Sequence, residues 1–88
     1  MNRVKLRLFG AFRDYSENPV LEFDIVSPMT VAEFRELVVE RLKALKHSSQ
    51  TDALVSDSAL ADEDSTLGEQ DLVRAGQELA ILPPVCGG

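Results

Sequence analysis

The chain has 88 residues, enough for one domain and too few for two. Its net charge of -6 argues against a nucleic-acid partner and favours a basic protein surface instead. No apolar run approaches the roughly 20 residues of a membrane span, and the N-terminus lacks the apolar core of a signal peptide. The single cysteine excludes a disulfide within the chain and fits a reducing compartment, so we expect a cytoplasmic protein that does not contact the membrane.

The N-terminal part predicts a hairpin. Residues 3–9 alternate strictly between polar and apolar side chains, which indicates a half-buried strand. The inward-facing positions are Val4, Leu6 and Leu8. The same parity places Phe9 on the outward face. Residues 20–26 alternate in the same way after a polar, turn-rich segment, so the two runs predict paired strands.

A helix is predicted next. Thr30 can cap its N-terminus, and Glu33 three residues later completes a capping box. Apolar residues then recur at helical spacing and predict one stripe facing a sheet. They are Phe34, Leu37, Val38, Leu42 and Leu45. The helix should end near residues 46–49, and the sequence contains no other clear helix.

The second half predicts short strands separated by loops. Residues 53–55 and 59–61 are each expected as a short strand. Residues 78–82 form the last strand, with Ala80 and Leu82 on its outward face. One helix over one sheet, in the order strand–strand–helix–short strands–strand, is an α+β fold.

The end of the chain carries the most specific chemical pattern. Its last six residues are Pro83, Pro84, Val85, Cys86, Gly87 and Gly88. The two prolines cannot continue a sheet and should project the last four residues as a stiff, extended piece. The two glycines lack a Cβ, so this end could enter a passage too narrow for other residues. The pattern predicts a stalk that presents the Gly88 carboxylate to another protein's active site, against the alternative of a frayed terminus.

The segment from Ile81 to Gly88 resembles the C-terminus of the molybdopterin synthase small subunit, a family of ubiquitin-like sulfur carriers. Residues 76–78 resemble the family's Gly-Asp-Glu turn, while residues 9–14 and 30–35 resemble its first loop and its helix start. The chain departs from the family at Cys86, where Ser or Thr is more usual, and in a longer segment around residues 68–75.

The resemblance implies the β-grasp fold. In that fold a mixed sheet of four to five strands carries one main helix on one face. Residues 1–82 would form this domain, and residues 83–88 would form the extended tail. The first and last strands would be parallel neighbours, which would place Phe9 and Leu82 at the same end of the sheet, beside the root of the tail.

The resemblance also implies a function for Gly88 as the sulfur carrier. An E1-like adenylating enzyme would use ATP to activate its carboxylate, and a sulfur donor protein would convert the acyl-adenylate to a thiocarboxylate. The tail, with Pro83, Pro84, Val85, Cys86 and Gly87, would then enter the synthase large subunit and deliver sulfur to cyclic pyranopterin monophosphate. Two small and two large subunits would form a heterotetramer, and this chain would itself bind no cofactor and no metal.

An apolar docking surface is expected beside the tail root. Phe9 and Leu82 would contribute to it, and the family match adds Leu60 as a third position. Isolated apolar residues on a surface are common, which is the alternative interpretation of the same side chains.

Other interpretations use the same terminus or other side chains. One is a sulfur carrier for thiamine, cysteine or RNA thiolation, and another is a ubiquitin-like modifier that forms an isopeptide with lysine. A cysteine enzyme is disfavoured because no base lies beside Cys86 in the sequence. The lone His47 and the acidic residues 62–64 lack the ligand spacing of zinc and calcium sites.

Overall fold

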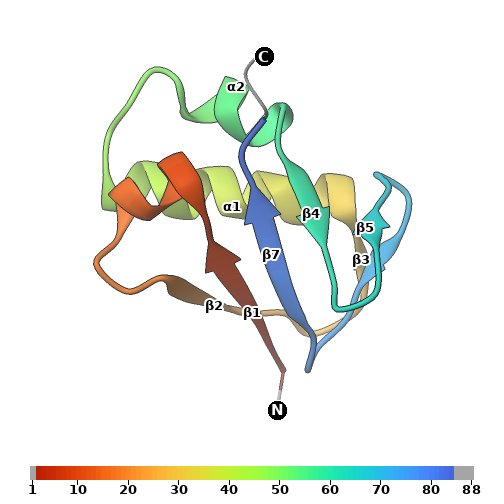
Figure 1. The fold of residues 1–88 in the computed structure, drawn as a ribbon. Coiled ribbons are helices and arrows are strands. Elements are labelled where there is room, and N and C mark those ends of the chain that lie inside the picture. The colour runs from red at the N-terminus through yellow and green to blue at the C-terminus, as the bar shows by residue number, and fades with distance from the viewer. Residues whose placement is uncertain (1, 85–88) are drawn as a thin grey trace.

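A computed structural model describes residues 2–84, and in it a mixed sheet carries one long helix on one face (Figure 1). The elements in chain order are β1 (Arg3–Leu8), the 3-10 helix η1 (Gly10–Tyr15), β2 (Val20–Asp24), β3 (Met29–Thr30), α1 (Val31–Leu45), α2 (Thr51–Ser56), β4 (Ala59–Ala61), β5 (Thr66–Leu67), β6 (Leu72–Val73) and β7 (Glu78–Leu82). Five strands form the main sheet in the order β2-β1-β7-β4-β5, while β3 and β6 form a separate pair. The predicted α+β architecture is confirmed.

Strand β1 lies between its two predicted neighbours. It pairs antiparallel with β2, which confirms the hairpin, and parallel with β7, with Lys5–Leu8 opposite Glu78–Ile81. Side chains along β1 alternate between exposed and buried, as the sequence pattern requires. The apolar faces of β1, β2 and β7 therefore meet α1 in one core layer.

Helix α1 begins at the predicted capping box. The Thr30 hydroxyl accepts a hydrogen bond from the Glu33 N–H at 3.2 Å, and the Glu33 carboxylate accepts one from the Thr30 N–H at 3.0 Å. The buried positions of the stripe are Val31, Phe34, Val38 and Leu42. The prediction for Leu45 was wrong, because this side chain lies in the last turn and is 46% exposed.

Two short helical segments replace the loop and strand that the sequence indicated. The strand predicted at residues 53–55 was wrong, because these residues lie within α2. The side chains of α2 that face the core are Thr51 and Val55, which are four residues apart as helical spacing demands. In η1 the buried residues Phe12 and Tyr15 are three apart, which suits a 3-10 helix.

The longer segment around residues 68–75 supports the start of α1. The carbonyl of Asp71 accepts a hydrogen bond from the Val31 N–H at 2.9 Å, and the carbonyl of Glu69 accepts one from the Ala32 N–H at 3.1 Å. These carbonyls satisfy two of the amides that a helix leaves unpaired at its N-terminus. The segment is therefore part of the support of α1.

The capping box should make stability depend on pH. The hydrogen bond from the Thr30 backbone, followed by that from its hydroxyl, lowers the pKa of the Glu33 carboxyl below its ordinary 4.5. A carboxyl with a lower pKa in the folded state stabilises the fold above its unfolded pKa, and this contribution is lost as pH falls through the folded pKa. The variant Glu33→Gln keeps an acceptor that does not titrate. It should therefore lose less stability than wild type between about pH 6 and pH 3 in urea unfolding.

The matched control is Glu36→Gln, which removes an exposed carboxylate of the same helix that lies outside the capping box. It should lose stability on acidification as wild type does. An equal loss in Glu33→Gln and wild type would show that the capping box does not contribute to the pH dependence.

Candidate functional site

The tail root lies where the central strand β7 ends. Strands β1 and β4 flank β7, and the chain leaves the sheet at Leu82 through Pro83 and Pro84, both half-buried. Because β1 and β7 are parallel, their carboxyl ends reach the same edge of the sheet, at the top of Figure 1. The predicted functional residues Val85, Cys86, Gly87 and Gly88 lie outside the described residues.

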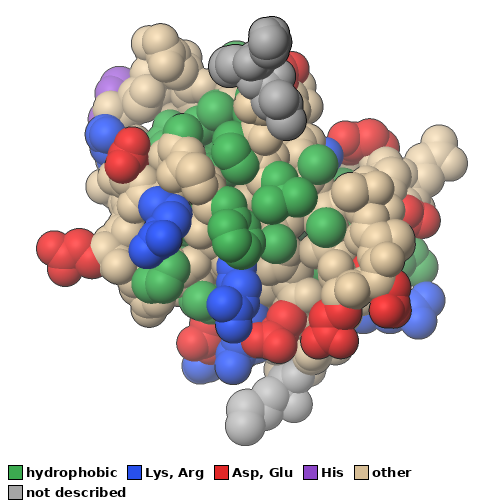
Figure 2. Space-filling model, in the orientation of Figure 1, with side chains coloured by type: hydrophobic (Ala, Val, Ile, Leu, Met, Phe, Trp, Pro, Cys, Tyr) green, Lys and Arg blue, Asp and Glu red, His purple; other side chains and the backbone are tan. Residues whose placement is uncertain are grey.

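Apolar side chains gather on the outer face of the sheet beside this root. Phe9 is 40% exposed and Leu82 is 37% exposed, which confirms that both point outward. Strand β4 adds two alanines, since Ala59 lies opposite Leu82 and Ala61 opposite Ala80. We call Phe9, Ala59, Ala61, Ala80 and Leu82 the outer-face patch. Figure 2 shows apolar side chains over β7 and β4 on this face.

The prediction that Leu60 belongs to a docking surface was wrong. Leu60 is fully buried and lies opposite Ile81, which is also fully buried in the core. Neighbouring residues of a strand point to opposite faces, so the outward positions of β4 are Ala59 and Ala61. Leu60 stabilises the domain from inside, and two alanines take its place on the surface.

Buried side chains of η1 and α2 close the core at the end where the tail leaves. Phe12 is fully buried, and the hydroxyl groups of Tyr15 and Thr51 share a buried hydrogen bond of 2.9 Å. Arg35 of α1 donates hydrogen bonds from Nη1 to the carbonyl of Val55 at 2.7 Å and to the hydroxyl of Ser58 at 2.9 Å. These contacts fix both segments to the core behind the tail root.

Gly10, the first residue of η1, touches the tail root directly. Its backbone is left-handed, with φ +57°, and a Cβ at this position would lie 2.6 Å from Cγ of Pro83. Sequence reasoning missed this contact, because the two residues are far apart in the chain. A glycine next to an exposed aromatic at the end of a predicted strand was the only local signal.

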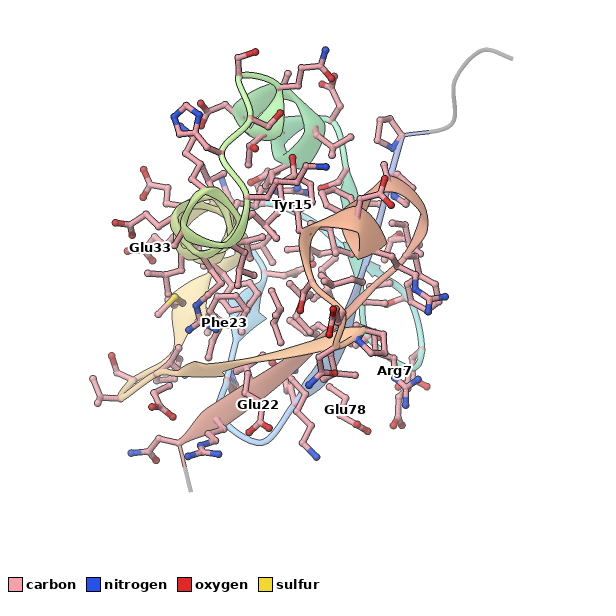
Figure 3. All side chains as sticks on the ribbon, turned by 90° about the vertical axis from the view of Figure 1, so that its left-hand side faces the viewer. Arg7, Tyr15, Glu22, Phe23, Glu33 and Glu78 are labelled. Carbon is pink, nitrogen blue, oxygen red and sulfur yellow. The ribbon has the colours of Figure 1, made fainter. Side chains whose placement is uncertain are left out.

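Basic side chains border the outer-face patch although the chain as a whole is acidic. Arg7, two residues before Phe9, lies opposite Ala80 of the patch. Further from the tail root, Lys5 lies opposite Glu22 and Glu78, so a positive side chain on β1 stands between negative side chains on β2 and β7. Figure 3 shows Arg7, Glu22 and Glu78 projecting from the sheet on the side away from α1.

Nearly the whole chain matches one family of known proteins. The family model described as the ThiS family matches residues 6–88. The chain belongs to the ThiS family. No protein of curated function matches the chain.

Solved structures of other proteins share the fold of this ThiS-family chain. It resembles the small archaeal modifier protein 1 of Haloferax volcanii with TM-score 0.71 and 21% identity, covering 98% of this chain and 99% of that one. The corresponding protein of Methanosarcina acetivorans gives TM-score 0.68 and 23% identity, covering 100% and 98%. A Pyrococcus furiosus protein described as a putative molybdopterin converting factor, subunit 1, gives TM-score 0.67 and 17% identity, covering 97% and 100%.

These similarities confirm the β-grasp fold, and at such identities they establish the fold alone. Together with the family match, they identify a ThiS-family protein with the ubiquitin-like β-grasp fold.

The acidic segment of this ThiS-family chain has a structural role. The Asp62 carboxylate accepts hydrogen bonds from the backbone N–H groups of Asp64 and Ser65, both at 2.8 Å. The bond from Ser65, followed by that from Asp64, lowers the pKa of the Asp62 carboxyl.

Within residues 2–84, no group of three or more His, Cys, Asp or Glu side chains is arranged to hold a metal ion. None of the helices described is long and apolar enough to cross a membrane.

The burial of Leu60 and the exposure of Phe9 predict different effects of truncation. Leu60→Ala removes a fully buried side chain and should lower the free energy of unfolding by about 2–5 kcal/mol. Phe9→Ala removes a side chain that is already partly in water and should cost about 1 kcal/mol or less. Urea unfolding of both variants measures the difference, and a larger loss in Phe9→Ala would contradict the assignment of faces.

Proposed function

We propose that this chain is the sulfur-carrier small subunit of molybdopterin synthase. In this proposal an E1-like enzyme joins the Gly88 carboxylate to AMP from ATP and releases pyrophosphate. A sulfur donor protein then delivers sulfur at the sulfide level of oxidation to the acyl carbon, AMP leaves as the C–S bond forms, and a thiocarboxylate remains. The loaded tail enters the large subunit and passes the sulfur to cyclic pyranopterin monophosphate, and water takes its place at the acyl carbon, which returns Gly88 to a carboxylate.

The observation that carries the proposal is the position of the outer-face patch. Its apolar side chains lie on β4 and β7 and directly after β1, beside the point where the chain leaves the sheet. A partner that buries an apolar patch with a charged border gains both affinity and orientation. A partner seated there would hold its active site within reach of the tail.

The residues around the tail root fit a carrier whose chemistry is supplied by partners. Phe9, Ala59, Leu82, Pro83 and Pro84 carry no acid, base or nucleophile on their side chains. Activation of a carboxylate by ATP needs cations and phosphate-binding groups, which the adenylating enzyme would provide. ATP is therefore a substrate of that partner in this proposal, and the chain needs no cofactor of its own.

The choice of molybdopterin synthase rests on the tail and on one structural relative. Pro83-Pro84 before the last four residues matches the tail of that family, and the Pyrococcus furiosus relative is described as a putative molybdopterin converting factor subunit. We place the cycle in the cytoplasm, in keeping with one cysteine and no disulfide within the chain. Two copies of the chain would bind two large subunits.

The second candidate is a ubiquitin-like modifier. It is favoured by the similarity to the small archaeal modifier proteins of Haloferax volcanii and Methanosarcina acetivorans. Both candidates begin with adenylation of Gly88 and differ in the group that attacks afterwards. Sulfur gives a thiocarboxylate, whereas a lysine amine gives an isopeptide.

The intact mass of the chain tests the proposed function. Incubation with ATP, an adenylating enzyme and a sulfur source should increase the mass by the difference between one sulfur and one oxygen. Deletion of Gly88 should abolish this gain, because the next carboxylate would stand one residue short, while the thermal unfolding midpoint stays unchanged. Covalent adducts on lysines without a thiocarboxylate would favour the modifier, and normal loading of the deletion would overturn the role of Gly88.

The outer-face patch predicts where charge should disrupt partner binding. Phe9→Asp and Leu82→Asp should each raise the dissociation constant for the large subunit by about tenfold or more, since they place a charge in an apolar contact. The control is Leu72→Asp, since Leu72 is 43% exposed but belongs to β6 in the smaller sheet. Calorimetric titration measures binding, and thermal unfolding verifies that all three variants fold. If Phe9→Asp and Leu82→Asp bind the large subunit as tightly as Leu72→Asp and the wild type do, the patch is not an interface.

A further inference from the structure

Gly10 and Pro83 form a close contact that connects the first loop to the tail root. Gly10 follows the outward-facing Phe9, and Pro83 follows the outward-facing Leu82. Since β1 and β7 are parallel neighbours, with Leu8 opposite Ile81, both residues leave the sheet at the same level. The proline ring occupies the space next to Gly10 that a side chain would need.

Three distances describe this contact. A Cβ placed on Gly10 would lie 2.6 Å from Cγ, 3.4 Å from Cδ and 3.6 Å from Cβ of Pro83. Carbon atoms that are not bonded to each other prefer about 3.5–4.0 Å, so the first distance requires a displacement of about 1 Å. A proline ring is closed on its own backbone nitrogen and cannot rotate away as an open side chain can. The backbone at residue 83 or at residue 10 would have to move.

Gly76 is a control position. It separates the effect of the Gly10–Pro83 contact from the general cost of placing a side chain on a left-handed backbone. It is the other glycine of residues 2–84 with a positive φ, at +91°, and a Cβ there would meet nothing within 4 Å. Alanine at either position would have to adopt a positive φ, which residues with a Cβ disfavour. Only at position 10 would the added methyl group also displace the tail root.

We propose that Gly10 is a positioning residue: it leaves room for the Pro83 ring against η1 and thereby sets the direction in which the tail leaves the sheet. The support behind Gly10 is rigid, because Phe12 is fully buried and Tyr15 hydrogen-bonds to Thr51. The contact therefore fixes the position of the Pro83 ring relative to η1.

The direction of the tail matters because the reacting group lies well beyond this contact. Gly88 is five residues past Pro83, and each residue can add up to about 3.3–3.6 Å of reach. A rotation at Pro83 therefore changes the region of space that Gly88 can reach. The consequence for sulfur transfer rests on the proposed function, whereas the contact itself does not.

A spin label on Cys86, the single cysteine, measures the direction without any partner. The nitroxide broadens the amide NMR signals of residues near it, so the set of broadened signals reports the direction of the tail. In Gly10→Ala the added methyl group should displace the Pro83 ring and change this set of signals. Gly76→Ala should keep the wild-type pattern. The same pattern in wild type and Gly10→Ala, or an equal change in Gly76→Ala, would overturn the proposal.

A double-mutant comparison identifies the atoms responsible. In a Pro83→Ala background the ring that Gly10→Ala would meet is absent, so adding the methyl group should change the pattern little. An equally large change in both backgrounds would overturn the proposal. If Gly10→Ala does not fold, Gly10→Asn replaces it, because asparagine tolerates a left-handed backbone and still carries a Cβ.

The transfer reaction gives the second readout. With thiocarboxylated protein and saturating large subunit, Gly10→Ala should slow sulfur transfer about tenfold to hundredfold, the size of effect that a 1 Å misplacement can have. Gly76→Ala should transfer at the wild-type rate, and equal slowing of both would overturn the proposal. A wild-type chain that cannot be loaded with sulfur would contradict the proposed function, while the spin-label experiment would still decide the role of Gly10.

Discussion

The parallel pairing of β1 with β7 is the constraint on which the rest of this structure depends. It brings the first and last strands together in the middle of the sheet, with β2 on one side and β4 on the other. Parallel strands end at the same edge, so the strand pairing alone places Phe9 and Leu82 at the same end of the sheet. The tail therefore leaves from the centre of the sheet, where neighbours on both sides hold its root.

The two faces of the sheet carry different kinds of side chain. The inner face is filled by fully buried residues such as Leu6, Leu60 and Ile81, which pack beneath α1. The outer face carries small apolar residues and charges that contribute little to folding, such as the exposed ion pair of Arg3 with Glu22 at 2.9 Å. Changes on the outer face can therefore leave the core intact, which would allow the proposed partner surface to vary on a constant fold.

Local patterns in the sequence were sufficient for much of the fold. Strict alternation predicted β1 and the outward position of Phe9, and Thr30 with Glu33 predicted the start of α1. Patterns failed where a segment was too short to show its period. Residues 53–55 fit a strand as well as a helix, and the polar Thr51 concealed the inward face of α2 because its hydroxyl is satisfied by Tyr15.

The candidate site was only partly predictable, since part of it arises from contacts between distant residues. Leu60 was placed on the surface by alignment with a family, whereas its pairing with Ile81 puts it inside. The contact of Gly10 with Pro83 exists only once β1 and β7 are paired. Before that pairing is known, both residues have the character of ordinary loop and turn formers.

The central position of β7 also has a consequence for folding. Its partners β1 and β4 come from distant parts of the chain, and Lys5 pairs with Glu78, so the sheet closes through contacts of high sequence separation that form slowly. Until β7 inserts, β1 and β4 each present an unpaired edge that invites aggregation. A chain truncated before residue 78 would keep both edges open, so proteases and chaperones would treat it as unfolded before it could compete for a partner.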